Sequence, residues 1–359
     1  MILRMLPRSS TTTMPTLFRM ALFFYWFLLL MPSAAWSAPT GDPASLDEPP
    51  LIKSAMELLN QGRHDSLLVL SSRLITHDPE SPIGYFLAAD VYQTMMRDFR
   101  VKRYAAQFDS LIRIAAAKAA IRLERMPTAE NHFIAGTVNG YYCLALFQSG
   151  SYLKALKTAE NSIELMRKAA ALEPGFADPL FAIALYEYNK SKFLFGLLGG
   201  NATEAVAKLR EVEQKGRYVS ANASYALQAM YFDHGEYDSA LVVNDQLYKR
   251  YPENPSCLYN RARLLEKENR LPEAREVWES LIAILQKRKP ASNGYLAECH
   301  YHLAWIHRQQ QEEGEARKLL HQAARFAARR RGEEEVDGSF IKFKEIKKAI
   351  NTALQEWGQ

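Results

Sequence analysis

Cysteine is scarce in this chain of 359 residues, which has only Cys143, Cys257 and Cys299. Three cysteines cannot build a disulfide framework, and the chain has no C-x-x-C pair for zinc or redox chemistry. Glycine (17) and proline (16) are too few for a collagen-like chain or a low-complexity linker. A content of 48% hydrophobic and 24% charged residues excludes a largely disordered chain. The chain is long enough for two or three domains, or for one extended array.

Several enzyme motifs are also absent. The sequence has no Gly-x-Ser-x-Gly elbow, no Gly-Lys-Ser/Thr phosphate loop and no dinucleotide fingerprint. Carboxylate pairs are plentiful, but they follow the spacing of helix surfaces. We therefore predict a protein that is not an enzyme, with no catalytic residues and no cofactor.

One cluster of metal-ligand types lies within a single predicted helix and comprises Glu298, Cys299, His300, His302 and His307. Glu298 and His302 share a face at i, i+4, and Cys299 and His302 share one at i, i+3. Zinc draws its ligands from more than one turn or element, and the motif H-E-x-x-H is missing. We predict no metal site here, with metal-dependent catalysis at His302 as the alternative.

Two cysteines can be placed by their neighbours. Cys143 stands in the apolar run Tyr-Tyr-Cys-Leu-Ala-Leu, which predicts a buried core thiol. Cys257 stands at a predicted helix start, where the pKa of a thiol can fall. A reactive thiol is therefore the alternative to a structural one at Cys257.

Acidic residues are absent from residues 1–41, which carry three arginines, the last of them Arg19. An apolar run follows Arg19 and ends at Pro32, and the small-residue stretch 33–38 comes next. A basic start, an apolar run and a small-x-small site are typical of a secretory signal peptide. We predict a signal peptide over residues 1–37, then a short linker over 38–48.

The processing of this segment stays open. Cleavage after Ser37 or after Ala35 satisfies the small-x-small rule, and Met14 is an alternative start to Met1. Cleavage predicts a periplasmic or secreted protein. The alternative is a membrane-anchored protein, because no charge occurs between residues 20 and 41.

Loss of the signal peptide would change the charge balance. The net charge would fall from +5 to +2, because three arginines and no acidic residue are removed. A nucleic-acid partner is therefore not expected. The local excess of basic residues over 97–125 predicts a solvated helix face, with a strip for an anionic partner as the alternative.

A period of 34 residues runs through the second half of the chain. The segment 235–240, Gly-Glu-Tyr-Asp-Ser-Ala, ends 34 residues before Ala274, and Tyr231 and Leu265 are also 34 apart. With Gly or Ala, Tyr, Ala, an aromatic residue and Pro at fixed offsets, the pattern resembles the tetratricopeptide repeat (TPR) family. Further matches to this frame start at Gly62, Gly150 and Leu303.

The resemblance implies an all-α fold, a TPR-like α-α superhelix of about seven helix pairs. Antiparallel helices cross closely only where side chains are small, and no pair buries its apolar face alone, so the pairs must stack. We predict the repeat domain over residues 49–337 and a capping helix over 338–359. The repeats are least regular over 82–125 and 176–215. The predicted helices lie near 49–61, 64–77, 82–97, 99–125, 127–148, 151–172, 176–194, 201–215, 219–234, 237–251, 254–268, 271–287, 293–310, 313–331 and 339–357.

Three connecting or terminal segments carry further expectations. Residues 329–337 are predicted to form a solvated loop in which opposite charges offset each other. The apolar stretch 193–198 is predicted to pack under a neighbouring pair, with a lip of the concave face or a membrane contact as alternatives. The capping helix is predicted to bury one face, formed by Ile341, Ile346, Ile350 and Leu354, with a partner-binding amphipathic helix as the alternative.

The resemblance also implies a binding surface, because the first helix of each TPR pair lines a concave groove. A tyrosine recurs at one repeat position, and tyrosine and tryptophan offer a large contact area with a polar end. The alternative is that these tyrosines serve packing alone. The groove residues implied by the frame are Asn222, Tyr225, Phe232, Tyr259, Arg263, Glu266, Tyr301, Trp305 and Arg308.

The function predicted from the sequence is non-catalytic binding of a protein or peptide partner in the groove, in envelope assembly or maintenance. A membrane-anchored component that assists export or complex assembly is the alternative, and membrane contact is expected only if the N-terminal segment stays uncleaved. Self-association through the groove is left open.

Overall fold

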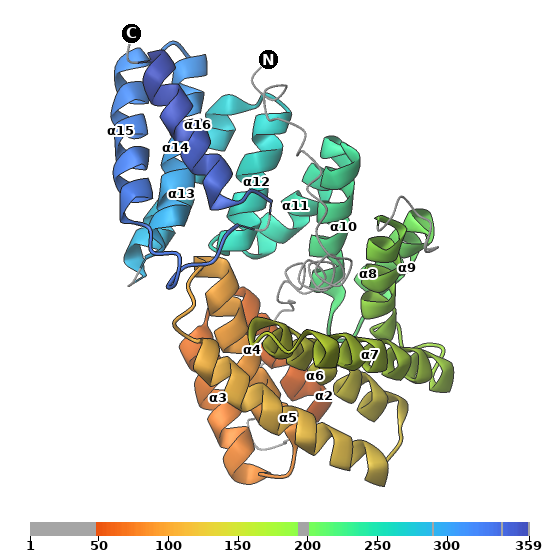
Figure 1. Ribbon diagram of the computed structural model, residues 1–359. Helices are drawn as coiled ribbons and strands as arrows, with labels where there is room; N and C mark the ends of the chain where they lie inside the picture. Colours follow the sequence, from red (N-terminus) through yellow and green to blue (C-terminus); the bar gives the residue numbers. More distant parts are fainter. Residues whose placement is uncertain (1–47, 193–200, 289–290, 339, 358–359) are drawn as a thin grey trace.

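The computed structural model describes residues 48–192, 201–288, 291–338 and 340–357 (Figure 1). The predicted signal peptide, its alternative as an anchor and the apolar stretch 193–198 lie outside these residues. The helices within the described part are α2 (Glu48–Asn60), α3 (His64–His77), α4 (Pro82–Phe99), α5 (Ala105–Arg125), α6 (Ala129–Gln148), α7 (Tyr152–Leu172), α8 (Pro179–Lys192), α9 (Ala202–Lys215), α10 (Ser220–His234), α11 (Tyr237–Arg250), α12 (Pro255–Lys267), α13 (Leu271–Lys287), α14 (Asn293–Gln309), α15 (Glu313–Arg329) and α16 (Phe343–Trp357).

These fifteen helices form seven consecutive pairs, from α2 with α3 to α14 with α15, followed by α16. The structure thus confirms the all-α fold and the succession of helix pairs. The third pair is the longest, with 20 residues in α6 and 21 in α7. This length accounts for the wide spacing of the repeat frame there.

Helix ends follow the local sequence. The side chains of Ser81, Asn201 and Asn254 each accept a hydrogen bond from a backbone N–H in the first turn of α4, α9 and α12. Gly150 and Gly235 adopt a φ of 78° just after α6 and α10. This left-handed conformation strains residues with a Cβ, which explains glycine at these turns.

Small residues lie where helices cross, both within a pair and between successive pairs. A Cβ on Gly84 of α4 would come within 2.9 Å of the backbone nitrogen of Ile75 on α3. The Ser162 hydroxyl of α7 donates to the carbonyl oxygen of Gly136 on α6 at 2.6 Å. The alanines that define the repeat frame are all at most 2% exposed, namely Ala155, Ala205, Ala240, Ala274 and Ala316.

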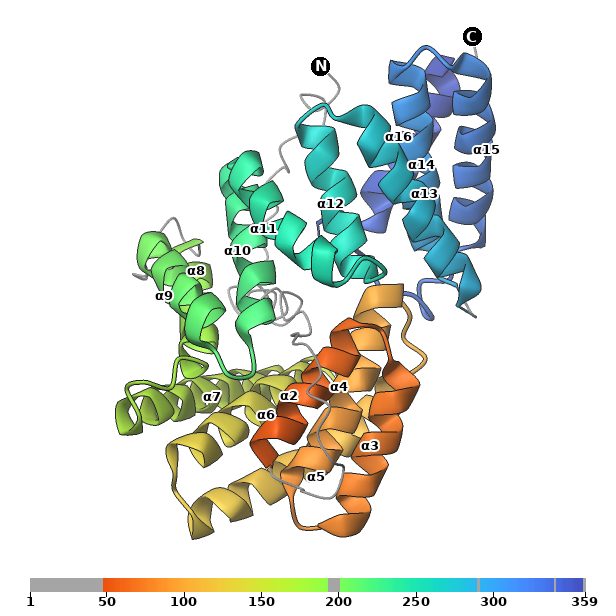
Figure 2. The same cartoon turned by 180° about the vertical axis from the view of Figure 1, so that it is seen from behind.

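The superhelix curves until its two halves touch. Asn254, before α12, donates to the carbonyl oxygen of Asn60 at the end of α2, at 3.1 Å. Val101, after α4, forms an antiparallel β-bridge with Glu335, after α15. The first two pairs therefore lie beside the last three (Figures 1 and 2). The predicted concave groove is therefore bounded by contacts between the two halves, which the repeat frame does not indicate.

The last helix covers the final pair, as predicted. α16 contacts α14 and α15, and the Arg308 guanidinium of α14 lies 4.7 Å from the ring centroid of Trp357. The buried face differs in part from the prediction, because Ile341 precedes the helix and Leu354 is only half buried. The buried residues of α16 are Ile346, Ile350, Ala353 and Trp357.

The connection between α15 and α16 is exposed over most of residues 329–337, with opposite charges paired as predicted, but Glu335 departs from this prediction. Glu335 is 5% exposed and pairs with the α4–α5 turn. The balance of charges in the sequence does not show that the Glu335 carboxylate is buried against other parts of the chain. Among the described residues, no helix has the length and apolar character needed to span a bilayer.

Candidate functional site

The first helices of successive pairs are joined side by side by polar contacts. The Tyr141 hydroxyl of α6 donates to Asp90 Oδ1 of α4 at 3.0 Å, and Asn260 Nδ2 of α12 donates to Gln228 Oε1 of α10 at 2.8 Å. These helices form the inner wall of the superhelix, which we call the concave face. It is the candidate functional site.

On α4, a polar stripe faces this interior. Asp90 is 1% exposed, and burial raises the pKa of its carboxyl to about 6, while the bond from Tyr141 opposes the shift. Two turns later, Arg97 Nε and Asp98 Oδ1 form a buried ion pair at 2.8 Å. The hydroxyl of Ser256 on α12 donates to the same Asp98 oxygen at 2.9 Å. The stripe thus links the second pair to the sixth.

Some buried polar atoms of the concave face are unsatisfied. Gln93 Oε1 on α4 and Gln228 Nε2 on α10 have no hydrogen-bond partner in the described part of the chain. A buried polar atom without a partner costs about 1–3 kcal/mol, and native proteins keep few of them. Gln93 and Gln228 are only 4% and 2% exposed, so this acceptor and this donor are enclosed by neighbouring side chains.

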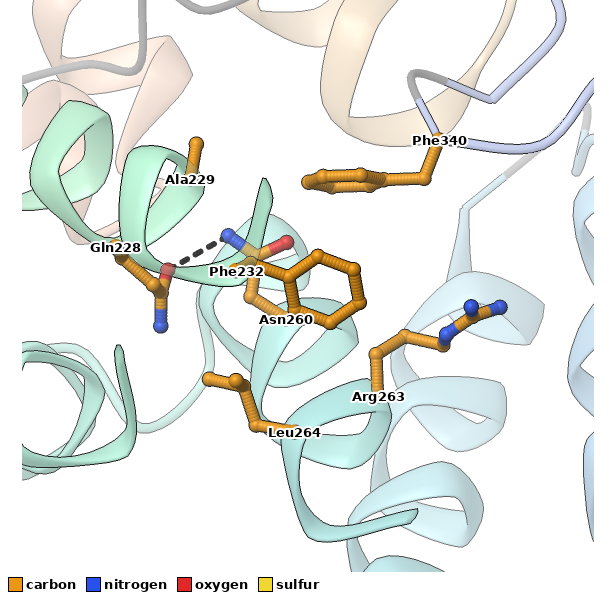
Figure 3. A pocket seen from close by; sticks show the side chains of 7 residues that line it. All are labelled: Gln228, Ala229, Phe232, Asn260, Arg263, Leu264 and Phe340. Atoms are coloured by element: carbon orange, nitrogen blue, oxygen red, sulfur yellow. Dashed lines mark hydrogen bonds between the residues drawn. The ribbon is translucent and has the colours of Figure 1, made fainter. Parts of the chain in front are cut away.

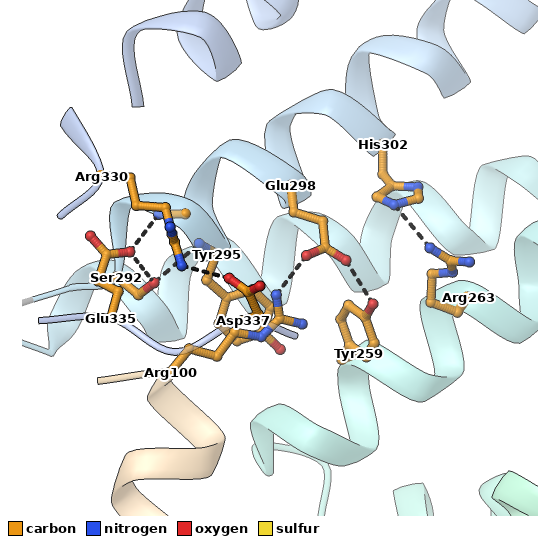
Figure 4. A network of polar contacts seen from close by, with 11 residues as sticks. Arg100, Tyr259, Arg263, Ser292, Tyr295, Glu298, His302, Arg330, Glu335 and Asp337 are labelled. Atoms are coloured by element: carbon orange, nitrogen blue, oxygen red, sulfur yellow. Dashed lines mark hydrogen bonds and ion pairs between the residues drawn. The ribbon is translucent and has the colours of Figure 1, made fainter. Parts of the chain in front are cut away.

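The junction between the two halves is built on Arg100 (Figure 4). Its Nη1 pairs with Glu298 Oε2 of α14 at 2.5 Å, and both side chains are almost fully buried. The Tyr259 hydroxyl of α12 donates to the other oxygen of Glu298 at 2.6 Å. Burial would raise the pKa of Glu298, but the Arg100 guanidinium beside it lowers the pKa below its ordinary value.

The guanidinium of Arg100 is also held from its sides. Its Cζ lies 3.7 Å from the ring centroid of Tyr295. On another side lies Gly338, where an added Cβ would come within 2.8 Å of Arg100 Cζ. Arg100 itself has a φ of 53°, a conformation uncommon for residues with a side chain. The ion pair between Arg100 and Glu298 is therefore surrounded by protein atoms and not by solvent.

An aromatic pocket lies next to the junction (Figure 3). The Phe340 ring lies 5.5 Å from the Phe232 ring and 6.0 Å from the Tyr259 ring, measured between centroids. The remaining cavity is about 10 Å³, which is room for one water molecule. The residues that line it are Gln228, Ala229, Phe232, Asn260, Arg263, Leu264 and Phe340.

The residues predicted for the groove fall into two groups. Asn222, Tyr225 and Tyr259 are buried, and burial raises the pKa of the Tyr225 and Tyr259 phenols. The ring of Tyr259 contacts Trp278, Tyr295 and Phe340, so it serves the packing of the inner wall. The half-buried group comprises Phe232, Arg263, Glu266, Tyr301, Trp305 and Arg308.

The predicted histidine cluster is engaged in separate interactions. His302 stacks on Trp278 at 4.7 Å and lies between Glu266 (2.9 Å) and Arg263 (3.2 Å). Because the guanidinium can only donate, His302 Nε2 accepts and Nδ1–H donates to Glu266. His300 and His307 bond elsewhere, to Leu296 O and to Glu312. Within the described residues, no group of three or more His, Cys, Asp or Glu is placed to hold a metal ion.

The cysteines are buried free thiols. Burial raises the pKa of Cys143 and Cys257 to about 12, and that of Cys299 well above its ordinary value. The helix start therefore does not activate Cys257, because desolvation of the thiolate outweighs the helix dipole. The core-thiol prediction for Cys143 is confirmed.

Most basic side chains within residues 97–125 form ion pairs or hydrogen bonds with other residues of the chain. Arg97 and Arg100 are buried in ion pairs, and Lys118 and Arg122 bond Glu80 and Asn131. A strip for an anionic partner needs its cations free. The alternative of an electropositive binding surface is therefore not supported.

Several residues of this face could not be found from the repeat frame. Arg100 lies in the turn after α4, and Glu298 was considered only as a metal ligand. Phe340 follows a charged run and precedes the last helix. The available signal was an aromatic residue shortly after a charged run, and the sequence does not show which residues its ring contacts.

The chain was compared with known proteins and structures. No protein-family model and no curated protein matches it. A chain of the APC/C hetero-tetramer Cut9–Hcn1 is 15% identical, and the match covers 86% of this chain and 50% of that chain, with a TM-score of 0.50. This chain thus spans about half the length of that structure.

Two bacterial TPR structures match with lower TM-scores. The C-terminal part of a TPR repeat-containing protein from Cytophaga hutchinsonii is 15% identical, covering 78% of this chain and 96% of that one, with a TM-score of 0.40. A thermophilic TPR protein from Thermus thermophilus is 16% identical, covering 60% and 96%, with a TM-score of 0.40. From its seven stacked helix pairs and its capping helix, the chain is an all-α helical-repeat protein with the TPR-like α-α superhelix fold.

Proposed function

We propose that this protein is a non-catalytic scaffold that holds an extended peptide segment of a partner protein against its concave face. The main support is the inner wall itself, where the buried side chains of Gln93 and Gln228 keep an unpaired acceptor and an unpaired donor. Rotation of these side chains would present both groups to a ligand. A peptide backbone supplies both a donor and an acceptor at every residue except proline. An extended chain is therefore the ligand whose chemistry these side chains complement.

The place where this scaffold would act is also a proposal. The basic, apolar and small-residue order of residues 1–38 supports export by a cleaved signal peptide. We propose a periplasmic or secreted protein with a role in envelope assembly or maintenance. An anchored protein that assists complex assembly is the second candidate, favoured by the uncharged stretch 20–41.

Mass spectrometry of the purified mature protein distinguishes these two addresses. A chain that begins at Trp36 or Ala38 shows cleavage and removes the anchor. A chain that retains residues 20–41 and sediments with membranes would overturn the proposal of a cleaved signal peptide and support the anchored form.

The binding proposal is tested by capture of partners from envelope extract. The variant Gln93→Ala with Gln228→Ala removes the two unpaired groups from the concave face. We expect at least a tenfold loss of captured partner, because two hydrogen bonds of about 1 kcal/mol or more each would be lost.

A matched variant changes the outer surface instead. Leu153 and Val242 are 73% and 60% exposed, on α7 and α11. Leu153→Ala with Val242→Ala is expected to capture as much partner as the wild type. Equal capture by both double variants would show that the concave face is not the binding site.

A further inference from the structure

Part of the concave face is occupied by the chain itself. We call residues 330–338 and 340–342, which connect α15 to α16, the strap. Lys102 N donates to Glu334 O at 2.8 Å, and Val336 N donates to Arg100 O at 3.1 Å. These bonds flank a single antiparallel β-bridge between Val101 and Glu335. Main-chain pairing of this kind is how peptides commonly dock on exposed backbone.

The strap is further fixed by polar contacts on one side. Glu335 Oε2 accepts bonds from the Ser292 hydroxyl and from Gly294 N, each at 2.7 Å (Figure 4). Arg330 Nη2 pairs with Asp337 at 2.5 Å. These bonds fix Glu335, which follows a turn at residues 332–334, against the N-terminal start of α14.

The aromatic residue of the strap then enters the inner wall. The Phe340 ring is nearly parallel to the Tyr259 ring, with an interplanar angle of 22°, and tilted by 53° to the Phe232 ring. Both partner rings belong to the residues implied by the repeat frame for the groove. Figure 3 shows Phe340 reaching over Phe232 and Asn260 from outside the helix layer, with Arg263 beside it.

Main-chain pairing together with an anchored aromatic side chain is a complete peptide-recognition mode. We propose that the pocket formed by Phe232, Tyr259 and Arg263 is the anchor site for an aromatic residue of an extended partner peptide, and that Phe340 occupies this site in the free protein. This inference rests on the proposed peptide-binding function. It adds the residue type that the site selects and the segment that competes for it.

The energetics make the competition effective. A tethered segment acts at an effective concentration in the millimolar range, so a free peptide that makes the same contacts binds weakly to the intact protein. Removal of the Phe340 ring weakens only the anchor of the strap, because its main-chain bonds lie at residues 334 and 336. A free peptide that carries the aromatic residue should then compete better.

The test uses a fluorescein-labelled synthetic peptide with the sequence of residues 330–342, read by fluorescence anisotropy. We expect it to bind the full-chain variant Phe340→Ala at least tenfold more tightly than the wild type. The same peptide with alanine in place of its phenylalanine is expected to bind that variant at least tenfold more weakly. Equal binding of the two peptides, or no gain over the wild type, would overturn the proposal.

Two further variants keep this test decisive. If the variant Phe340→Ala does not melt cooperatively, Phe340→Leu takes its place in the test, because leucine keeps apolar volume in the pocket. Phe343→Ala is the matched control, because the Phe343 ring is contacted by Arg330 at 4.4 Å and does not line the pocket. It should leave peptide affinity at the wild-type level, and a tenfold gain there would contradict the assignment to Phe340.

The two proposals fail separately. If the peptide does not discriminate but Gln93→Ala with Gln228→Ala still loses captured partner, only the aromatic site is wrong. If the peptide discriminates and partner capture survives that double change, the aromatic site stands and the polar part of the concave face is not used.

Discussion

Asp90 shows how far a single side chain departs from its behaviour in water. Its carboxyl lies in the α4 stripe, bonded to Tyr141, and burial raises its pKa to about 6 from 3.8. The folded state therefore holds the proton more tightly than the unfolded state. This contribution to stability is complete below pH 3.8 and is lost as the pH rises through 6.

Asp90→Asn should therefore stabilise the protein in a pH-dependent manner. At pH 8 the wild type must keep a buried carboxylate, at a cost of up to about 3 kcal/mol. The amide removes this charge and can still accept the Tyr141 bond. We expect a gain in the free energy of unfolding that is about 2 kcal/mol larger at pH 8 than at pH 4.5, measured by urea titration. A gain independent of pH would show that Asp90 does not titrate in this range.

At the scale of elements, the α4–α5 turn and helix α14 are joined by the ion pair between Arg100 and Glu298. Their ion pair is buried, so its loss is not comparable to that of a surface pair. Arg100→Met leaves the Glu298 carboxylate buried without its cation and is expected to cost about 3–5 kcal/mol. A double-mutant cycle with Glu298→Gln should recover part of this cost.

An exposed ion pair provides the control. Arg270 and Glu273 on the surface are 43% and 50% exposed and pair at 2.5 Å. Arg270→Met should change the free energy of unfolding by about 1 kcal/mol or less. Similar losses at the two sites in chemical denaturation would mean that the Arg100 pair is as solvated as the surface pair.

The capping helix α16 is a second element whose role can be measured. Trp357 is buried, and Arg308 lies over its ring. Trp357→Ala is expected to cost about 3–5 kcal/mol and to expose the last pair, so that self-association rises in light scattering. Gln355 on the same helix is exposed, and Gln355→Ala should leave both stability and mass unchanged.

The elements themselves were largely predictable. Each repeat alanine must be small because two helices cross there, so its spacing locates both helices of a pair. Most of the charged run 329–337 is exposed, as its charge pattern predicts, but Glu335 within it is buried. Glu335 is buried by groups from α14 and the α4–α5 turn, and nothing local to the run indicates that they will be near.

At the scale of the whole molecule, the two ends of the superhelix are held together by contacts between distant residues. Tyr251 and Arg250 of the fifth pair both bond Glu57 of α2, at 3.3 and 3.4 Å. Together with the contacts of Arg100 and the strap, these bonds close one turn of the superhelix. The concave face is therefore a bounded space whose access depends on these contacts.

Arg100→Glu should open this turn, because it places a carboxylate against Glu298 in a buried site. Like charges in contact at low dielectric repel by several kcal/mol. We expect a larger radius of gyration in small-angle X-ray scattering with an unchanged far-UV circular dichroism spectrum. An unchanged radius in a folded variant would show that the remaining contacts close the turn alone.

The sequence by itself determined the helix pairs, their order, the crossing alanines and the final cap, because these depend on short-range periodicity and on side-chain size at fixed offsets. Only the tertiary structure decided how tightly the pairs wind, and therefore which residues meet across the turn. Small rotations between successive pairs add up over seven pairs, and no local pattern encodes their sum. That sum brings Arg100 to Glu298 and Phe340 to Tyr259, so the chain itself partly fills the predicted groove.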